Sequence, residues 1–143
     1  MRSKRNRQKT SRGSVLMETG LVFVVFAFLI IGSFDFGQFL FVHQALVERA
    51  RSAARWGAVH DPTDSTSIKN MVLYDQSATP TDGTAAYFNL TSDNVSVTNP
   101  DSGTDNYRLN IQISGYSYTV LSPYIGGTQT GQPITVSVPL GLY

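Results

Sequence analysis

The sequence contains no cysteine, so disulfides and thiolate metal sites are excluded. Basic residues are also scarce over most of the chain. After Gly13 only five Lys and Arg remain against ten Asp and Glu, a net charge of −5 for this part. Nucleic-acid binding requires clustered positive charge along one face, so this acidic body argues against nucleic acid as a partner.

Residue patterns typical of an active site are missing as well. His43 and His60 stand apart, and there is no HExxH pair, phosphate-binding glycine loop or nucleophile elbow. Asp101 and Asp105 lie near Gly103, but the remaining ligands of a calcium loop are absent. We therefore predict no metal, no other cofactor and no enzyme activity, and we expect His43 to be a packed or interfacial residue.

The basic residues that the body lacks are concentrated at the N-terminus. Six of the eleven Lys and Arg precede Gly13, and an apolar run follows them at residues 15–34, with Glu18 as its only charge. A helix of about 20 apolar residues spans a bilayer core of ~30 Å. Residues 21–31 are apolar on every side, as expected of a membrane-spanning helix. The sequence therefore predicts one transmembrane helix.

The charge distribution also predicts an orientation. Positive charge flanking a span is retained in the cytoplasm, which places the C-terminal part outside. An ordinary secretory signal is cut after its apolar region. Here the small residues of a plausible cut, Gly13-Ser14, come before it. The apolar helix is therefore expected to stay on the mature protein.

Glu18 is out of place in an apolar run, because an ionised carboxylate at membrane depth is costly and such residues are functional by default. Cleavage after Gly13 would make Ser14 the N-terminus, and Glu18 would lie one helical turn from its new amine. The carboxylate could then pair with the amine of its own chain or with that of a neighbouring subunit. Alternatively, Glu18 marks the headgroup boundary.

The order of these features resembles a known family. A basic leader, Gly13-Ser14 and a glutamate at the fifth position after the cut are similar to the class III signal of type IV pilins. Asp35-Phe36-Gly37 after the span and an Ala-Ala-Arg run at Ala53, Ala54 and Arg55 narrow the resemblance to TadE-like minor pseudopilins of tight-adherence (Flp-type) pili. It covers residues 13–59. The chain departs from that pattern in having no proline in the span and Gln38 where an arginine is usual.

The resemblance implies a function and partners. It implies cleavage by a prepilin peptidase and a minor pilin-like role in assembling a pilus or secretion apparatus for adhesion. The partners would be other pilin-like subunits, pilus assembly membrane proteins and the bilayer. The protein would be located in the bacterial cytoplasmic membrane or incorporated in the pilus. The residues implied are Gly13 and Ser14 for processing and Glu18, Asp35, Gly37, Ala50, Ala53, Ala54 and Arg55 for assembly.

The helix is expected to continue beyond the span, because residues 35–59 lack proline and Asp61-Pro62 ends the pattern. Leu46, Ala50, Ala53 and Gly57 share one face of it. Small residues on a face allow close helix contacts. That face could pack on the protein's own domain, on other subunits, or on both, and Glu48 and Arg51 could pair at i, i+3.

The sequence after the helix predicts an α+β protein, in which a small antiparallel sheet packs on the projecting half of the helix, residues 35–59. We divide the chain into a basic leader (1–13), the helix (14–60), a polar loop-rich region (61–106) and a β-rich region (107–143). A short helix is expected at 67–74, strands at 84–90, 94–98, 107–114, 115–121 and 134–138, and a loop at 123–133. A tethered extracytoplasmic binding module that keeps its leader is the alternative function.

Overall fold

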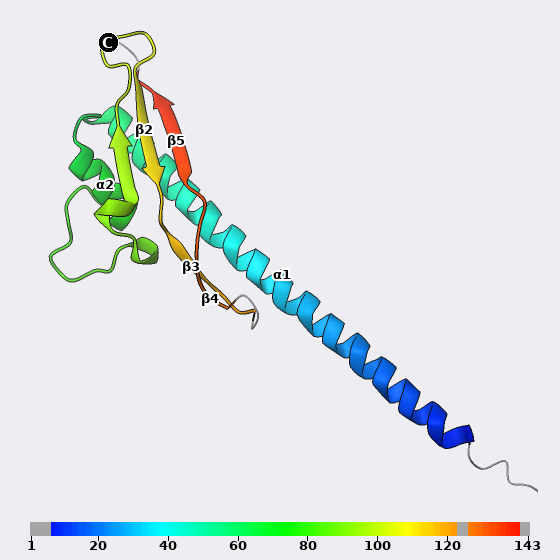
Figure 1. The fold of residues 1–143 in the computed structure, drawn as a ribbon. Helices are drawn as coiled ribbons and strands as arrows, with labels where there is room; N and C mark the ends of the chain where they lie inside the picture. The colour runs from blue at the N-terminus through cyan, green and yellow to red at the C-terminus, as the bar shows by residue number, and fades with distance from the viewer. Residues whose placement is uncertain (1–6, 123–125, 141–143) are drawn as a thin grey trace, which may run out of the picture.

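A computed structural model of the chain describes residues 7–122 and 126–140; for residues 7–12 only the backbone is described. A single long helix, α1 (Arg7–Val59), forms the axis of the molecule, and the other elements gather around its C-terminal half (Figure 1). Its 53 residues correspond to about 80 Å at ~1.5 Å per residue. The predicted α+β architecture, with a long apolar N-terminal helix before small antiparallel sheets, is confirmed.

The C-terminal end of α1 lies where the sequence predicts it, but its N-terminal end lies earlier in the chain than predicted. Its last residue, Val59, lies just before Asp61-Pro62 as expected, and the backbone N–H of His60 donates to the carbonyl of Trp56 over 3.1 Å. Its first residue is Arg7, so the helix starts inside the predicted leader rather than after it. No proline or glycine occurs between Arg7 and Arg12. With nothing to interrupt it, the helix extends backward from the apolar run.

The rest of the described chain forms one short helix, two 3-10 turns and five strands. These are α2 (Ser65–Tyr74), η1 (Tyr87–Asn89), η2 (Ser92–Asn94), β1 (Val95–Thr98), β2 (Arg108–Ile113), β3 (Ser117–Val120), β4 (Gly127–Thr130) and β5 (Ile134–Pro139). Strands β1, β2 and β5 form an antiparallel sheet in that order, and β3 pairs with β4. The expected single sheet is therefore divided into two.

The division coincides with a glycine bend between β2 and β3. Gly115, between β2 and β3, has a φ of +68°, which bends the chain out of the first sheet. Gly131, between β4 and β5, donates its backbone N–H to the carbonyl of Tyr116 over 2.8 Å. The β3–β4 hairpin consequently continues from β2 and β5 along α1, toward the N-terminal half of the helix (Figure 1).

One core holds the three-stranded sheet against both helices. The residues at alternate positions of β2 that the sequence predicts to point inward, Leu109, Ile111 and Ile113, are all completely buried. They meet Leu46 of α1 and Ile68 of α2, which are also 0% exposed. We call this unit, residues 61–140 with the C-terminal half of α1, the head. Its cover by α1 is what so small a sheet needs for stability.

Two sequence predictions in the head are wrong. The strand expected at 84–90 is instead a loop that ends in η1, where Phe88 and Asn89 have positive φ values of 50° and 54° that prevent strand pairing. The Phe88 ring instead approaches Phe41 of α1, with 6.3 Å between ring centroids. The loop expected at 123–133 contains β4, whose threonines pair in register with β3; residues 123–125 lie outside the described chain.

Candidate functional site

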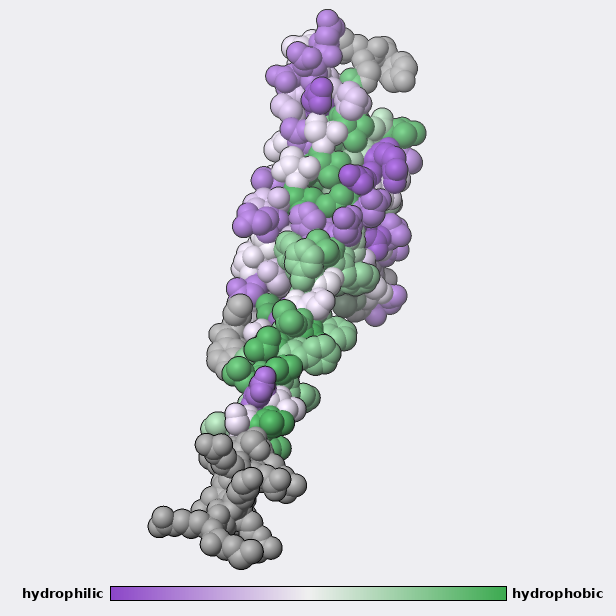
Figure 2. Space-filling view, turned by 90° about the vertical axis from the view of Figure 1, so that its right-hand side faces the viewer, coloured by the Kyte–Doolittle hydropathy of each residue, from purple (hydrophilic) through white to green (hydrophobic). Residues whose placement is uncertain are grey.

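The N-terminal half of α1 is apolar and uncovered. Among the described residues, α1 is the one helix long and apolar enough to cross a membrane, and no part of its most apolar stretch is buried by the protein itself. Met17 is 82% exposed and Phe23 is 70% exposed. In Figure 2 hydrophobic side chains gather in the lower part of the coloured surface, just above the grey residues, whereas hydrophilic ones are most frequent toward the upper end. Exposed apolar surface of this extent marks contact with a membrane or another protein.

The predicted processing and pairing residues all lie on this uncovered part. Gly13, Ser14 and Glu18 are exposed and helical. Ser14 and Glu18 are four residues apart, so they face the same side of α1 one turn from each other. An exposed Glu18 is available to a group outside this chain. The geometry is compatible with the amine pairing that the sequence predicts, which stays a prediction.

Asp35 lies in the N-terminal half of α1 and contacts the head, and the sequence indicates it as an assembly residue without identifying its partner. Asp35 Oδ1 accepts a hydrogen bond from the backbone N–H of Leu121 over 2.6 Å, and Oδ2 accepts one from Ser122 over 3.0 Å. These amides directly follow β3. A carboxylate that accepts two N–H groups forms charge-assisted bonds that are stronger than neutral ones. Asp35 thus fixes the end of the β3–β4 hairpin to α1 at the boundary of the apolar segment.

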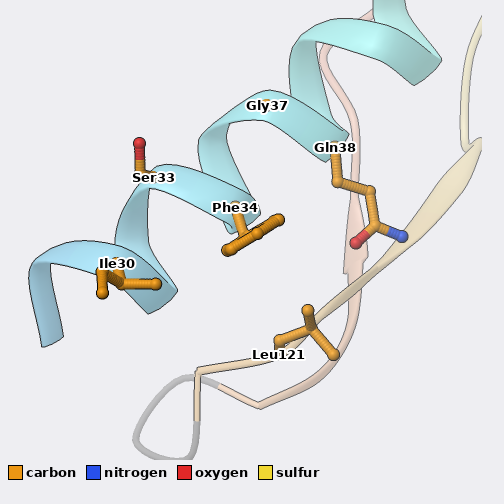
Figure 3. A pocket seen from close by; sticks show the side chains of 6 residues that line it. All are labelled: Ile30, Ser33, Phe34, Gly37, Gln38 and Leu121. Carbon is orange, nitrogen blue, oxygen red and sulfur yellow. The ribbon is translucent and has the colours of Figure 1, made fainter. Parts of the chain in front are cut away.

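An apolar groove lies between α1 and the hairpin beside this contact. It is lined by Ile30, Ser33, Phe34, Gly37, Gln38 and Leu121. Figure 3 shows Leu121 pointing from the hairpin toward α1, below Phe34 and Gln38. A Cβ atom on Gly37 would have no neighbour within 4 Å, so this glycine keeps the groove wide rather than permitting a close contact. A second groove, on the Phe36 side, is also largely apolar.

A buried aromatic contact holds the hairpin to α1 further along. Tyr116 is 1% exposed, and its hydroxyl lies 2.9 Å from Nδ1 of His43 on α1. Burial raises the pKa of the Tyr116 phenol, which therefore remains neutral at physiological pH. Phe39 stacks on His43 with 5.9 Å between ring centroids. His43 is thus a packed residue, as predicted, and Gly131 leaves the room that the Tyr116 ring occupies.

The small-residue face of α1 packs on the protein's own head. Ala50, Ala53 and Ala54 are 0% exposed within the core. A Cβ atom on Gly57 would lie 2.9 Å from side-chain atoms of Ile68 and of Leu109, so α2 and β2 approach α1 closely there. Of the alternatives that the sequence leaves open, the structure shows packing on the domain itself. The alanine side chains present no surface to another subunit.

The arginines of α1 differ in their surroundings. Arg55 is exposed, and Arg51 donates to Glu48 over 2.8 Å, the i, i+3 pair that the sequence predicts. Arg49, which the sequence analysis does not single out, forms an ion pair of 2.7 Å with Asp75. Its guanidinium also lies 4.5 Å from the centre of the Tyr87 ring. These partners are 26 and 38 residues away, beyond the reach of any helical spacing rule.

The carboxylates of the polar loops have structural partners. Asp61 Oδ1 accepts hydrogen bonds from the hydroxyl of Thr63 over 2.6 Å and from its backbone N–H, and both lower the pKa of Asp61. Asp64 caps α2 by accepting from Ser67, which likewise lowers its pKa. The described residues contain no group of three His, Cys, Asp or Glu that could hold a metal ion. These carboxylates therefore stabilise a turn, at Asp61, and the N-terminal cap of α2, at Asp64.

Together these features define a class of protein: a chain with one apolar N-terminal helix that could anchor it in a membrane by a single span, and a small α+β head on the continuation of that helix. The family model described as TadE-like protein matches residues 13–55. Over these residues the chain is similar to TadE-like proteins, as the sequence predicts. No curated protein and no solved structure matches. The match ends within α1, so the head is described by its structure alone.

Proposed function

We propose that this protein is a pilin-like (pseudopilin) subunit that takes part in assembling a tight-adherence pilus or a related secretion apparatus. The TadE-like match itself suggests involvement in the tight-adherence pilus system. The observation that carries the proposal further is the division of α1. Its N-terminal half is apolar and uncovered, whereas its C-terminal half is enclosed by a head with its own core. An assembly subunit requires a helix that is free to exchange lipid for the helices of its neighbours.

In this proposal the basic leader stays in the cytoplasm and the head lies outside. A prepilin peptidase cuts after Gly13, and Ser14 becomes the N-terminus. Glu18 then pairs with the amine of a neighbouring subunit, which sets the register of the two helices. Its exposure on α1 supports this role. Arg55 and Gly37 also remain accessible at the surface, so of the predicted assembly residues these are the ones positioned to contact partners.

The first test is the intact mass and N-terminal sequence of the protein recovered from membranes of its host. A chain that begins at Ser14 supports processing as a pilin-like subunit. A chain that retains its leader in the presence of the matching peptidase overturns that proposal. It leaves the alternative function, a head tethered to the membrane by an uncut helix.

The second test separates processing from assembly. We expect Glu18→Ala to leave cleavage intact and to reduce pilus assembly strongly, because the amine would lose its carboxylate partner in an apolar setting. Glu48→Ala, which removes an exposed carboxylate of the head half, is the matched control and should assemble normally. Pili counted by electron microscopy, with processing followed by mass, provide the two readouts. Normal pili with Glu18→Ala would remove the pairing role.

A further inference from the structure

The end of the β3–β4 hairpin lies beside the apolar segment of α1 rather than beside the rest of the head. Leu121 follows β3 and lines a groove with Ile30 and Phe34 of the helix. Its side chain is 65% exposed, although it neighbours the most apolar part of the molecule. An exposed leucine in that position is not accounted for by the core of the head.

The helix length places this groove relative to a bilayer. Starting at Val15, the first apolar residue after the leader, about 20 residues at ~1.5 Å each cover the ~30 Å of a hydrocarbon core. The span then ends at Phe34. Leu121 contacts the same groove as Phe34 and as Ile30, one turn deeper. The hairpin end is therefore level with the outer edge of the hydrocarbon.

The polar groups at this level are already satisfied. Asp35 accepts both backbone N–H groups that follow β3, so neither amide needs water there. Unpaired backbone amides are costly in lipid. The charge of Asp35 is likewise engaged by two donors. We call this pair of hydrogen bonds the Asp35 clamp, and it removes the main obstacle to placing the end of a strand at a membrane surface.

We propose that the hairpin end is a second membrane contact, in which Leu121 inserts among acyl chains of the outer leaflet while Asp35 holds the hairpin in place. This inference rests on the membrane insertion in the proposed function. Lipid is favoured as the occupant because the groove is continuous with the uncovered apolar side of α1, which lipid covers in the same membrane. The head is then attached at two points, which restricts its tilt about α1.

The absence of cysteine allows a direct test, since one introduced thiol gives one labelled site. The full chain with Leu121→Cys, carrying an environment-sensitive fluorophore, is reconstituted in vesicles with lipids that bear a quencher either near the headgroup or deep in the acyl chain. We expect quenching at position 121 by the shallow quencher in preference to the deep one. Val25→Cys marks the middle of the span, and Ser137→Cys marks the exposed side of β5.

The Asp35 clamp is tested in the same background. Asp35→Asn replaces one acceptor oxygen with an amide donor that faces a backbone N–H. We expect the label at position 121 to lose quenching, toward the level of the Ser137 site, while the Val25 label stays quenched. Glu48→Gln, which alters an exposed carboxylate elsewhere on α1, should change neither label.

The outcomes separate this inference from the function on which it rests. A quenched Val25 label with an unquenched, water-accessible label at 121 overturns the hairpin contact and leaves membrane insertion intact. An unquenched Val25 label overturns both. A label at 121 that is shielded from water but reached by neither quencher, together with disulfide cross-linking between a copy carrying Leu121→Cys and a copy carrying Phe34→Cys, overturns the lipid contact. It assigns the groove to a second copy.

Discussion

The two halves of α1 show the same backbone in two different surroundings. The N-terminal half, residues 13–41, is almost wholly exposed and mostly apolar, and the parts of the head that it neighbours are the β3–β4 hairpin and, at Phe41, η1. In the C-terminal half, from Val42 onward, one face is buried under the sheet and α2, and the other is polar. A membrane helix gains stability from lipid around its circumference, whereas a head helix gains it from one packed stripe. Equivalent substitutions should therefore change the stability of the head in one half and leave it unchanged in the other.

The largest difference is expected from the same truncation made in each half. Leu46→Ala removes a completely buried side chain and should lower the free energy of unfolding of the head by about 2–5 kcal/mol. Leu29→Ala removes a side chain that is 67% exposed and should leave the stability of the head unchanged. Denaturant unfolding of the full chain in detergent, followed by the fluorescence of Trp56, measures both. Equal losses would contradict the independence of the two halves.

A charge placed in the N-terminal half of α1 tests the other side of the comparison. Val25→Arg lies at the middle of the predicted span and should disfavour insertion by about 2.5–3.5 kcal/mol. Unfolding of the head should not change, because Val25 contacts none of its core. Membrane fractionation measures the loss of insertion, and Val25→Leu is the control for side-chain size. A variant that inserts normally would argue that this half is not a span.

A smaller effect is expected where the hairpin joins α1. A Cβ atom at Gly131 would lie only 2.0 Å from the Tyr116 ring, so Gly131→Ala should destabilise the head by about 1–3 kcal/mol through overpacking. Gly20→Ala is the matched change in the N-terminal half of α1, where a Cβ atom meets nothing within 4 Å. Thermal unfolding monitored by circular dichroism should shift for the first variant only. Equal melting temperatures would show that Tyr116 can move aside.

The smallest effect concerns pH and the cap of α2. Hydrogen bonds from Ser67 lower the pKa of Asp64 in the folded protein, so its contribution is complete above the unfolded pKa near ~3.9 and is lost as the pH falls through the lower folded value. Asp64→Asn keeps a capping oxygen but does not titrate. The decrease in melting temperature between neutral pH and pH ~3 should therefore be slightly smaller in this variant than in the wild type.

The features that could be predicted from the sequence are those written in a local pattern. The end of α1 at Val59 follows from Asp61-Pro62, β2 and β5 follow from alternating apolar residues, and α2 lies within two residues of its predicted start. The errors occurred where local preference was weak or was overridden. Residues 84–90 have the composition of a strand, yet the packing of Tyr87 and Phe88 on α1 imposes left-handed backbone at Phe88 and Asn89.

The sequence by itself determined the basic N-terminal segment, the length of the apolar run, the position of Glu18 within it and the small-residue face of the helix, because each depends on residues within a few turns of one another. Only the tertiary structure decided what those features contact. Asp35 meets amides 86 and 87 residues further along the chain, and Ala53 faces the protein's own sheet rather than another subunit. Such contacts depend on how the chain returns to α1 after the bend at Gly115. No spacing along the sequence encodes that return, since it results from burying the faces of the sheet and the helix together.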